Sequence, residues 1–512
     1  MLKVKKIKSI LFHSLVLFII LILILGMHIY EVYGTIDFKQ ILFHIEFPFK
    51  KNSGNFVTAG FYYVIPRFVA VIIIYFIVYY LYRKIDITVT FRKIKTFSLN
   101  IIIKKFRWVW VGLLFVTTLF IYNKYFLIFD TIENFIISTE IYENYYVNPR
   151  EVKVTMPEKK RNLIYIYFES LETADLSEKN GGYRYQSITP EVEELAKENI
   201  NFSHTNKLGG FYQVPGTTYT VAAMIGQTAG LPLIPSGKRN GNQQDLYHGT
   251  LTNIYTLGEI LEDNGYQNYF MMGSDRYFAD RAGYLYAHGS YDVFDYNTAV
   301  IRKFIPTGYD IDWWGFEDKK LYEYAKIRLK EITKNDEPFN FSLLTVDTHP
   351  HGGYLDETCE VDESLTHYEN VYKCGSKMLY DFIKWLQKQP FYKNTTVIIS
   401  GDHLNMAKAD IRDTMPDNYD PTVLNIIMNS PITTNCYKNR IMTTFDMFPT
   451  TLAALGVEIE GNRLGLGTNL FSCDNTIAEE IGLKYFSNEL SKNSFYYKTC
   501  LLNGKCKKET IK

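Results

Sequence analysis

The chain lacks an excess of either charge, because 55 Lys and Arg residues balance 55 Asp and Glu residues among its 512 residues. Proteins that bind nucleic acid normally carry a basic surplus, so we expect no nucleic-acid partner. Internal repeats and low-complexity segments are also missing from the sequence. Hydrophobic residues make up 47 % of the chain, which excludes global disorder, and the length favours roughly two to four structural units.

Long apolar segments occur only near the start of the chain, where they predict three membrane-spanning helices. They are Leu11–Ile29, Phe61–Leu81 and Trp108–Phe129, and each has about the 20 residues needed to cross a hydrocarbon core. Trp108 and Trp110 begin the third segment, where interfacial aromatic residues are expected. A cleaved signal peptide is the alternative for the first segment, but two more spans follow it and no small-residue cleavage pattern stands out.

Basic residues predict the orientation of these spans. Four lysines precede the first span, and eight Lys and Arg residues lie between the second and third, from Arg83 to Arg107. The loop between the first two spans is poorer in charge until Lys50 and Lys51. The positive-inside rule therefore predicts a multi-pass protein of the cell inner membrane with a cytoplasmic N-terminus. Three crossings would place everything after about residue 130 in the periplasm or outside the cell.

Cysteine is absent from the first 358 residues, and all six cysteines lie in the part predicted to be extracytoplasmic. An even count there is typical of disulfides in an oxidising compartment, and it favours a periplasm over a Gram-positive surface. A zinc cluster is the alternative, but no C-x-x-C pair supports it. The close spacings suggest the pairs Cys359–Cys374 and Cys500–Cys506, which leaves Cys436 with Cys473.

Strand and helix signals alternate after residue 160, and they predict an α/β domain whose parallel or mixed sheet is covered on both faces. The expected strands are Asn162–Phe168, Tyr269–Met272, Phe339–Val346 and Thr395–Ser400. The expected helices are Pro190–Glu198, Leu257–Asn264, Lys319–Ile332, Ser364–Gln389 and Phe445–Leu455. We therefore divide the chain into a membrane domain (1–130), a juxtamembrane linker (131–160), the α/β domain (161–475) and a C-terminal extension with a disulfide (476–512).

Polar residues follow three of these strands, at the sheet edge where open α/β sheets bind ligands. Glu169 follows the first strand, Asp347 and His349 follow the third, and Asp402 and His403 follow the fourth. Each could be a solvated strand end or a turn residue by itself. Together they favour a site for one divalent cation, because carboxylate and imidazole groups are metal ligands. Mn²⁺, Mg²⁺ and Zn²⁺ are all compatible with this ligand set.

A nucleophile is expected in the segment between the first two strands. Thr217 and Thr218 follow Gly216, just before a stretch from Tyr219 to Met224 that can begin a helix. A helix N-terminus stabilises an anion, and a metal-bound hydroxyl there can attack phosphorus. The alternative interpretation is a threonine that only caps the helix.

These motifs, in this order, resemble the sulfatase-like branch of the alkaline phosphatase superfamily, and most of all its phosphoglycerol transferase I and lipoteichoic acid synthase family. The matching segments are Asn162–Glu172 (NLIYIYFESLE), Gln213–Pro232 with its V-P-G-T-x-x-T core, Thr345–Gly352 (TVDTHPHG), Ser400–Met406 (SGDHLNM) and Arg463–Leu470 (RLGLGTNL). The resemblance covers roughly residues 145 to 475. It implies an alkaline-phosphatase-like sheet sandwiched by helices, here preceded by three transmembrane helices. The C-x-P-S-R motif of true sulfatases is absent, so sulfate-ester hydrolysis is not expected.

The resemblance also implies a role for individual residues. It assigns Glu169, Thr217, Asp402 and His403 to the metal, with Thr217 as the nucleophile and Thr218 as its alternative. It assigns substrate binding to His349, which also serves the chemistry, and to Arg276. The order Ser274-Asp275-Arg276 departs from the family pattern, which makes Arg281 a possible substitute. His351 is a second candidate substrate contact, and Trp314, with its neighbour Trp313, is a candidate wall of a lipid or glycerol pocket.

The expected activity is a metal-dependent phosphotransferase reaction at the membrane, with Mn²⁺ as the first choice of metal. Thr217 would take the glycerophosphate head group from phosphatidylglycerol, releasing diacylglycerol, and a glycan acceptor would then receive it. Transfer of phosphoethanolamine to lipid A or another glycan is the nearest alternative, and a phosphodiesterase that uses water is another. A non-catalytic membrane scaffold is the alternative of a different class, and the intact metal and nucleophile positions argue against it.

Overall fold

The computed structural model divides the chain into two compact units. The first contains residues 1–41 and 51–131, and the second contains residues 42–50 and 132–512. The residues described are 2–34, 36, 38–46, 54–85, 88–91, 95–98, 105–234, 251, 253–309, 315–350, 352–407 and 411–505.

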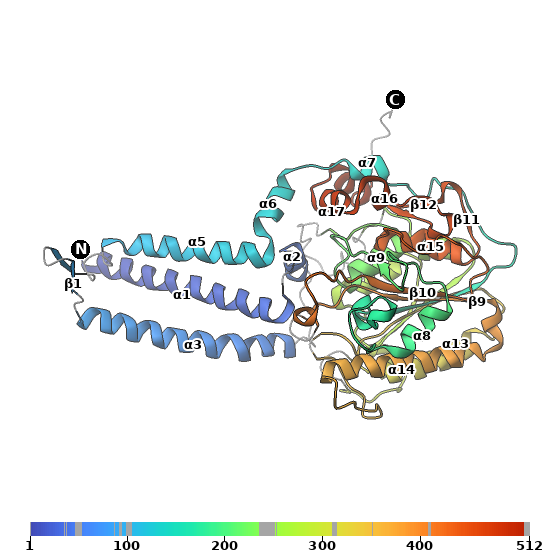
Figure 1. Ribbon diagram of the computed structural model, residues 1–512, viewed down its shortest axis with the longest axis horizontal. Coiled ribbons are helices and arrows are strands. Elements are labelled where there is room, and N and C mark those ends of the chain that lie inside the picture. Colours follow the sequence, from blue (N-terminus) through green and yellow to red (C-terminus); the bar gives the residue numbers. More distant parts are fainter. Residues whose placement is uncertain are drawn as a thin grey trace. The chain divides into compact units, whose positions relative to one another are not determined.

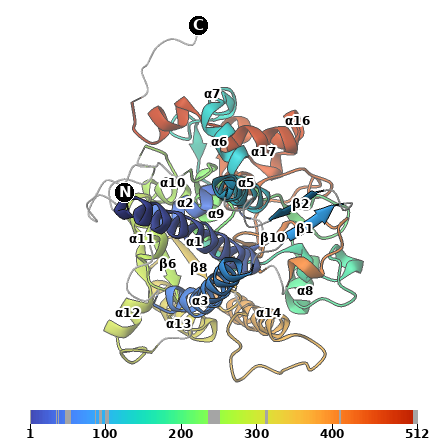
Figure 2. The same cartoon turned by 90° about the vertical axis from the view of Figure 1, so that its left-hand side faces the viewer.

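Three long helices dominate the described part of the first unit: α1 (Leu2–Tyr33), α3 (Gly54–Lys84) and α5 (Arg107–Phe126). Figures 1 and 2 show α1 between the other two. Each contains a segment long and apolar enough to cross a membrane, namely Ile7–Val32, Phe61–Lys84 and Arg107–Phe126. The third ends before the predicted Phe129, because Leu127 adopts a left-handed conformation (φ 49°) and α6 (Ile128–Ile136) starts after it. The hairpin β1 (Thr88–Phe91) and β2 (Lys95–Ser98) is a shorter element of this unit, and the short helix α2 (Phe38–Glu46) contains residues of both units.

The second unit is built on a seven-stranded sheet in the order β5-β10-β9-β4-β8-β6-β7. The strands are β4 (Asn162–Phe168), β5 (Gly210–Phe211), β6 (Gln267–Met272), β7 (Asp292–Phe294), β8 (Phe339–Leu344), β9 (Thr395–Gly401) and β10 (Val423–Met428). Strands β9, β4, β8, β6 and β7 are parallel neighbours, whereas β10 pairs antiparallel with β9 and with β5. The four predicted strands are confirmed within one or two residues at each end. The edge formed by β10 and β5 was not predicted.

The central strand β4 shows how the sheet is covered on both faces. All seven of its residues are buried, and alternate side chains enter different cores because successive residues of a strand point to opposite faces. Ile164 and Ile166 pack with α8 (Pro190–Glu198), α13 (Asp318–Ile332) and α14 (His367–Gln387). Leu163 and Tyr165 pack with α9 (Thr220–Ala229), α10 (Leu257–Asp263) and α15 (Met447–Ala454). The two helix layers lie on either side of the strands in Figure 1, which confirms the predicted sandwich.

Side-chain caps explain several helix starts. The Thr366 hydroxyl accepts from the Glu369 N–H, and the Glu369 carboxylate accepts from the Thr366 N–H, so α14 begins after Thr366 rather than at the predicted Ser364. Thr256 and Glu259 form the same capping box at α10. The smaller helices are α7 (Ile141–Tyr145), α11 (Arg281–Ala287), α12 (Tyr296–Ile301), α16 (Ile477–Ile481) and α17 (Leu483–Ser491). The short strand pairs are β3 (Val154–Thr155) with β11 (Glu458–Ile459) and β12 (Arg463–Leu464) with β13 (Gly467–Thr468).

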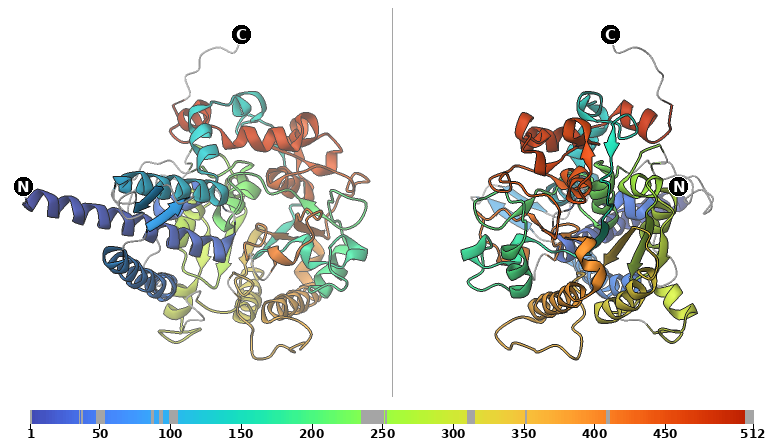
Figure 3. Two further views of the ribbon diagram at one scale, coloured as in Figure 1. Left: turned by 60° about the vertical axis from the view of Figure 1, so that its left-hand side comes forward. Right: turned by 90° about the vertical axis from the view of Figure 1, so that its right-hand side faces the viewer.

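The C-terminal helices belong to the core of the second unit. Ile141 and Tyr142 of α7 are buried in the same cluster as Phe486 and Leu490 of α17 and Ile225 of α9. Figure 3 shows the cyan segment of α6 and α7 beside the red C-terminal helices. Segments far apart in the sequence therefore close one side of the sheet together.

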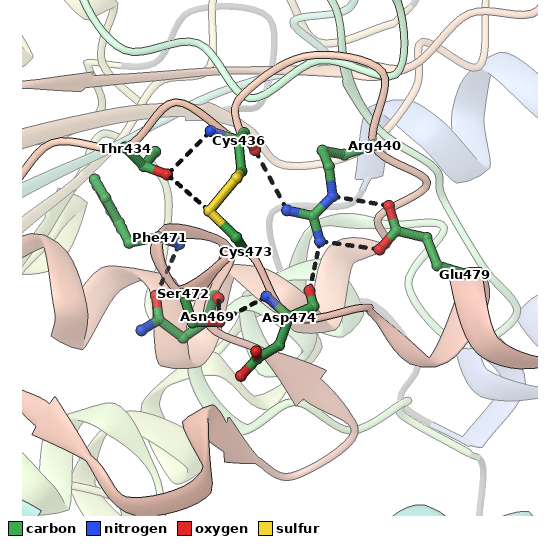
Figure 4. The surroundings of a disulfide bond; sticks show 9 residues. All are labelled: Thr434, Cys436, Arg440, Asn469, Phe471, Ser472, Cys473, Asp474 and Glu479. Atoms are coloured by element: carbon green, nitrogen blue, oxygen red, sulfur yellow. Dashed lines mark hydrogen bonds and ion pairs between the residues drawn. A yellow bond between two sulfur atoms is a disulfide. The ribbon is translucent and has the colours of Figure 1, made fainter.

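Two of the three predicted disulfides lie among the described residues and are confirmed. Cys359 pairs with Cys374, which links the loop after β8 to α14. Cys436 pairs with Cys473, beside the ion pair of Arg440 and Glu479 (Figure 4). The third predicted pair includes Cys506, which lies outside the described residues.

Candidate metal centre

Three side chains predicted as metal ligands converge beyond the ends of β4 and β9. Glu169, Asp402 and His403 each offer one ligand atom, and these atoms all lie within 4.8 Å of one another. His403 Nε2 is 3.6 Å from Glu169 Oε1 and 3.3 Å from Asp402 Oδ2. All three side chains are buried. They meet because β4 and β9 are parallel neighbours whose carboxyl ends share one edge of the sheet.

The donor set fits a divalent cation. The Nδ1 atom of His403 lies 2.9 Å from the Leu404 carbonyl, which leaves Nε2 as the lone-pair nitrogen facing the carboxylates. The buried Oδ2 of Asp402 accepts no hydrogen bond from any residue that the structure describes. Burial and the neighbouring charge of Asp402 raise the pKa of Glu169 well above its usual range. A cation placed among these groups would offset the cost of two facing buried carboxylates.

Ser170 holds both carboxylates in place. Its hydroxyl donates to Glu169 Oε1 at 2.7 Å, and its backbone N–H donates to Asp402 Oδ1 at 2.8 Å. Ser170 adopts a left-handed conformation (φ 58°), which is uncommon for a residue with a Cβ atom. We interpret this backbone strain as the cost of directing both donors at the ligands.

Two tyrosines of α14 brace the three loops that meet at the site. The Asn405 side-chain amide donates to the phenols of Tyr368 (2.9 Å) and Tyr372 (2.6 Å). Tyr372 donates in turn to the Ser170 carbonyl, and Tyr368 donates to the Thr348 carbonyl. Thr348 completes the link by donating to the Glu169 carbonyl at 2.6 Å. The loops after β4, β8 and β9 are therefore tied together through one helix.

The structure separates the candidate hydroxyl groups. Thr217 is fully buried, and its hydroxyl donates to the Val214 carbonyl (2.8 Å) and accepts from the Val214 N–H and the Thr444 hydroxyl. Thr220 is the first residue of α9, and its hydroxyl lies 3.4 Å from Glu169 Oε2 and 3.5 Å from His403 Nε2. Thr218 precedes Tyr219, the N-cap of α9. The Thr220 hydroxyl therefore lies beside Glu169 and His403, whereas the Thr217 hydroxyl is bonded elsewhere.

The two candidate arginines also differ in their surroundings. Arg276 donates to Asp295 Oδ1 and to the Tyr286 hydroxyl at 2.6 Å, so a carboxylate already balances its charge. Burial opposes ionisation of Asp295, but the hydrogen bonds from Arg276 and Thr298 outweigh it and lower the pKa of this carboxyl. Arg281 is buried and donates to the Ser274 hydroxyl and to the carbonyls of Asp275 and Phe278.

No ion pair joins Arg281 to a carboxylate among the described residues. Burial lowers its pKa to about 10, although the negative charges of Asp275, Glu169 and Asp295 act against this shift. Arg281 is therefore a buried cation. The negative charge of Glu169 raises its pKa, but no carboxylate of the described residues forms an ion pair with it.

The remaining predicted residues lie after β8 or outside the described part. His349 is half-buried, and its Nδ1 atom lies 2.5 Å from the Pro350 carbonyl. Asp347 accepts from the Asp318 N–H at 3.1 Å, and Asp318 accepts from the N–H groups of Val346 and Asp347. The Asp347 carboxylate thus binds the backbone N–H at the start of α13, and it is not one of the three clustered candidate ligands. His351, Trp313 and Trp314 lie outside the described residues.

Sequence reasoning missed Thr220 and Ser170. The sequence predicts a helix start near Tyr219, so Thr220 could have been considered as the first threonine inside that helix. Ser170 carried no such signal, because its function depends on a left-handed backbone conformation that ordinary serine residues rarely adopt.

The fold and the three buried candidate ligands define an α/β protein with a candidate metal centre at its sheet edge. The Sulfatase family model matches residues 161–457, and the chain belongs to this family. Phosphoglycerol transferase I of Escherichia coli (strain K12) is 31 % identical over 269 residues, which are 51 % of this chain and 33 % of that protein. The same protein from Shigella flexneri matches equally well. The resemblance to the sulfatase-like branch of the alkaline phosphatase superfamily is confirmed, although the match spans only about a third of the curated relatives' length.

Solved structures with a similar arrangement include two proteins. Lipoteichoic acid synthase from Listeria monocytogenes is 22 % identical, with a TM-score of 0.48, over 65 % of this chain and 82 % of that chain. The integral membrane lipooligosaccharide phosphoethanolamine transferase A from Neisseria meningitidis is 13 % identical, with a TM-score of 0.49, over 87 % of this chain and 84 % of that chain.

Proposed function

We propose that the protein is a membrane-anchored phosphoglycerol transferase. It moves the glycerophosphate head group of phosphatidylglycerol to an extracytoplasmic glycan and releases diacylglycerol. One observation carries the proposal: a threonine hydroxyl at a helix N-terminus faces a buried cluster of Glu169, Asp402 and His403. The match to phosphoglycerol transferase I supports the choice of head group. The spans and their flanking charges support an inner-membrane protein whose second unit lies in the periplasm.

Thr220 is the nucleophile in this proposal and replaces Thr217. The Thr217 hydroxyl is occupied by three hydrogen bonds, whereas the Thr220 hydroxyl lies beside the candidate ligands. Thr220 is also the first residue of α9. The Ala223 N–H donates to the Tyr219 carbonyl and closes the first turn of this helix. The N–H groups before Ala223 and the helix dipole favour negative charge on the phosphoryl oxygens.

Glu169, Asp402 and His403 would hold one divalent cation, Mn²⁺ first and Mg²⁺ or Zn²⁺ as alternatives. When bound, such a cation lowers the pKa of a nearby hydroxyl and neutralises charge on the phosphoryl oxygens. In the first displacement, the Thr220 oxygen bonds to phosphorus and the bond to diacylglycerol breaks. The proton lost by Thr220 is balanced by the proton that diacylglycerol gains. An acceptor hydroxyl then displaces Thr220, which recovers its proton.

Arg281 and His349 complete the proposed machinery. Arg281, rather than Arg276, binds the phosphate, because no carboxylate of the described part neutralises it. His349, half-buried after β8, exchanges a proton with the leaving or entering oxygen. His351 and Trp314 remain proposed contacts of the substrate.

The test presents fluorescent phosphatidylglycerol and phosphatidylethanolamine separately to the purified chain in detergent with Mn²⁺, and follows diacylglycerol release. We expect release from phosphatidylglycerol, at least about 100-fold less in Thr220→Ala. Thr220→Ser should retain part of the activity, and Thr217→Ala should retain most of it. Release from phosphatidylethanolamine alone would support the proposed catalytic site but would identify phosphoethanolamine as the transferred head group. Activity in Thr220→Ala together with its loss in Thr217→Ala would overturn the assignment of the nucleophile.

A further inference from the structure

The second unit carries an apolar surface where the chain leaves the third candidate span. We call it the apolar patch; it consists of Ile132, Phe135, Ile136, Ile137 and Phe495, all exposed. Ile136 is 76 % exposed and Phe495 is 75 % exposed, which are high values for large hydrophobic side chains. Large exposed apolar patches mark interaction sites, so we expect the patch to contact a partner.

The apolar patch is one face of an amphipathic helix and the segment bonded to it. Ile132, Phe135 and Ile136 follow Ile128 at helical spacing, so they share one side of α6. Asp130, Glu133 and Asn134 alternate with them along the helix. Apolar residues confined to one side of a short helix favour binding at a boundary between water and an apolar phase.

Backbone hydrogen bonds hold the two parts of the patch together. The Asn493 N–H donates to the carbonyls of Asn134 (2.7 Å) and Ile137 (3.1 Å), and the Thr139 N–H donates to the Asn493 carbonyl. The buried Thr139 hydroxyl donates to Glu489 Oε2 at 2.6 Å. Phe495 lies two residues after Asn493. The end of α6 and the segment from Glu489 to Phe495 are therefore fixed to each other, which makes the patch a preformed surface.

Chain continuity identifies the partner. Leu127 is the C-cap of α5, and α6 starts at the next residue. A nine-residue helix is about 14 Å long, so the whole apolar face of α6 is tethered within that distance of the end of the span. Amphipathic helices at membranes bury their apolar faces about 5–10 Å into the head-group region, which is within this reach. Lys498, exposed three residues after Phe495, adds a positive charge that suits anionic head groups.

We infer that the apolar patch docks the second unit onto the surface of the lipid bilayer that α5 crosses. A second copy of the chain is a poorer candidate for the partner. Five partly exposed side chains present on the order of 500 Å², whereas a stable interface buries about 800 Å² per partner. The inference does not depend on the head group or on the identity of the nucleophile.

The test places a fluorophore on the patch in the full-length chain, reconstituted in lipid nanodiscs. Ile136→Cys is labelled with an environment-sensitive maleimide dye, and quenching by lipids that carry a spin label near the head group is measured. The described cysteines are all paired, which favours labelling of the introduced thiol. The matched control is Ile301→Cys, because Ile301 has the same side chain and is 78 % exposed on α12.

We expect spin-labelled lipid to reduce the emission at position 136 at least twofold and to leave position 301 nearly unchanged. Phe495→Cys, labelled in the same way, should behave like position 136. Equal quenching at positions 136 and 301 would overturn the inference, whether both values are low or high. An unquenched signal at 136 that changes with the number of chains per nanodisc would also overturn it, because a second copy would then cover the patch.

Discussion

The backbone N–H of Ser170 donates to Oδ1 of Asp402 at 2.8 Å, so the residue after one candidate metal ligand orients another. This bond crosses from β4 to β9, which are adjacent parallel strands. The Ser170 hydroxyl at the same time donates to Glu169. A residue that is not itself a candidate ligand therefore contacts both carboxylates, and the His403 N–H adds a second bond to Asp402 Oδ1 at 2.9 Å.

The first prediction concerns this residue. Ser170→Ala removes the hydroxyl bond to Glu169 and should weaken metal binding about 10-fold to 100-fold, as loss of a partner to a ligand typically does. Ser170→Gly should weaken binding equally, but it relieves the left-handed backbone and should leave the fold at least as stable as Ser170→Ala does. Titration of the metal-free protein with Mn²⁺ under electron paramagnetic resonance measures the affinity. Wild-type affinity in both variants would contradict the role given to the hydroxyl.

The second prediction separates stability from chemistry at the two threonines. Thr217→Val leaves the Val214 N–H and the Thr444 hydroxyl without their buried partner, while the Val214 carbonyl keeps its bond from the Thr217 N–H. We expect the free energy of unfolding to fall by about 1–3 kcal/mol. Urea unfolding of the protein in detergent checks this value. Thr220→Val is the matched variant, and it should change the unfolding free energy less, because the Thr220 hydroxyl reaches Glu169 and His403 of the described residues at the long distances of 3.4 and 3.5 Å.

The third prediction concerns the brace formed by α14. Tyr372→Phe removes the donor to the Ser170 carbonyl and the acceptor for Asn405, so the loop with Glu169 and Ser170 should lose part of its positioning. We expect metal affinity to fall several-fold, by the same route as other outer contacts of a metal site. Burial raises the pKa of Tyr372 well above its usual range, so the phenol stays protonated and the effect should not vary across neutral pH.

Tyr322→Phe is the control for this variant. The Tyr322 phenol is also buried, and it has no hydrogen-bond partner among the described residues. Its removal should leave metal affinity unchanged and the fold equally or more stable. Equal losses of affinity in the two variants would mean that the brace has no special role.

The fourth prediction is a pH dependence of stability at the ion pair of Arg440 and Glu479. Burial disfavours the Glu479 carboxylate, but the hydrogen bonds from Arg440 and Thr476 outweigh it and lower the pKa. A lowered pKa stabilises the fold above the unfolded value of about 4.3, and this contribution is lost as the pH falls through the folded pKa. Glu479→Gln should therefore cost about 2 kcal/mol at pH 7, and the difference from wild type should shrink below about pH 4.

Urea unfolding between neutral and acidic pH measures this difference. Glu480→Gln is the neighbouring control, because Glu480 pairs with Arg463 at a more exposed position. An exposed ion pair is worth only about 0–1 kcal/mol, so this variant should show little change at any pH. A gap between wild type and Glu479→Gln that stays constant down to pH 3 would contradict the proposed linkage.

Local sequence patterns were sufficient for much of the fold. The buried strand Asn162–Phe168 and the helix Pro190–Glu198 have the predicted bounds, because a run of β-branched and aromatic residues and a proline at the helix start are local signals. Strand β10 (Val423–Met428) escaped prediction, although its six residues are as many as those of β6 and β8. Its antiparallel place beside β9 depends on pairing across the sheet, which local patterns do not specify.

The sequence by itself determined the three apolar spans, the alternation of strands and helices, and the three candidate ligands Glu169, Asp402 and His403, which the structure brings together. These residues directly follow strands, and parallel strands bring their carboxyl ends to one edge. Only the tertiary structure decided which threonine hydroxyl faces the ligands and which arginine is left without a carboxylate. The first depends on where α9 begins, and the second on Asp295, which lies 19 positions from Arg276 in the sequence and contacts it through the fold. Such choices depend on side-chain partners that meet only when the chain is packed.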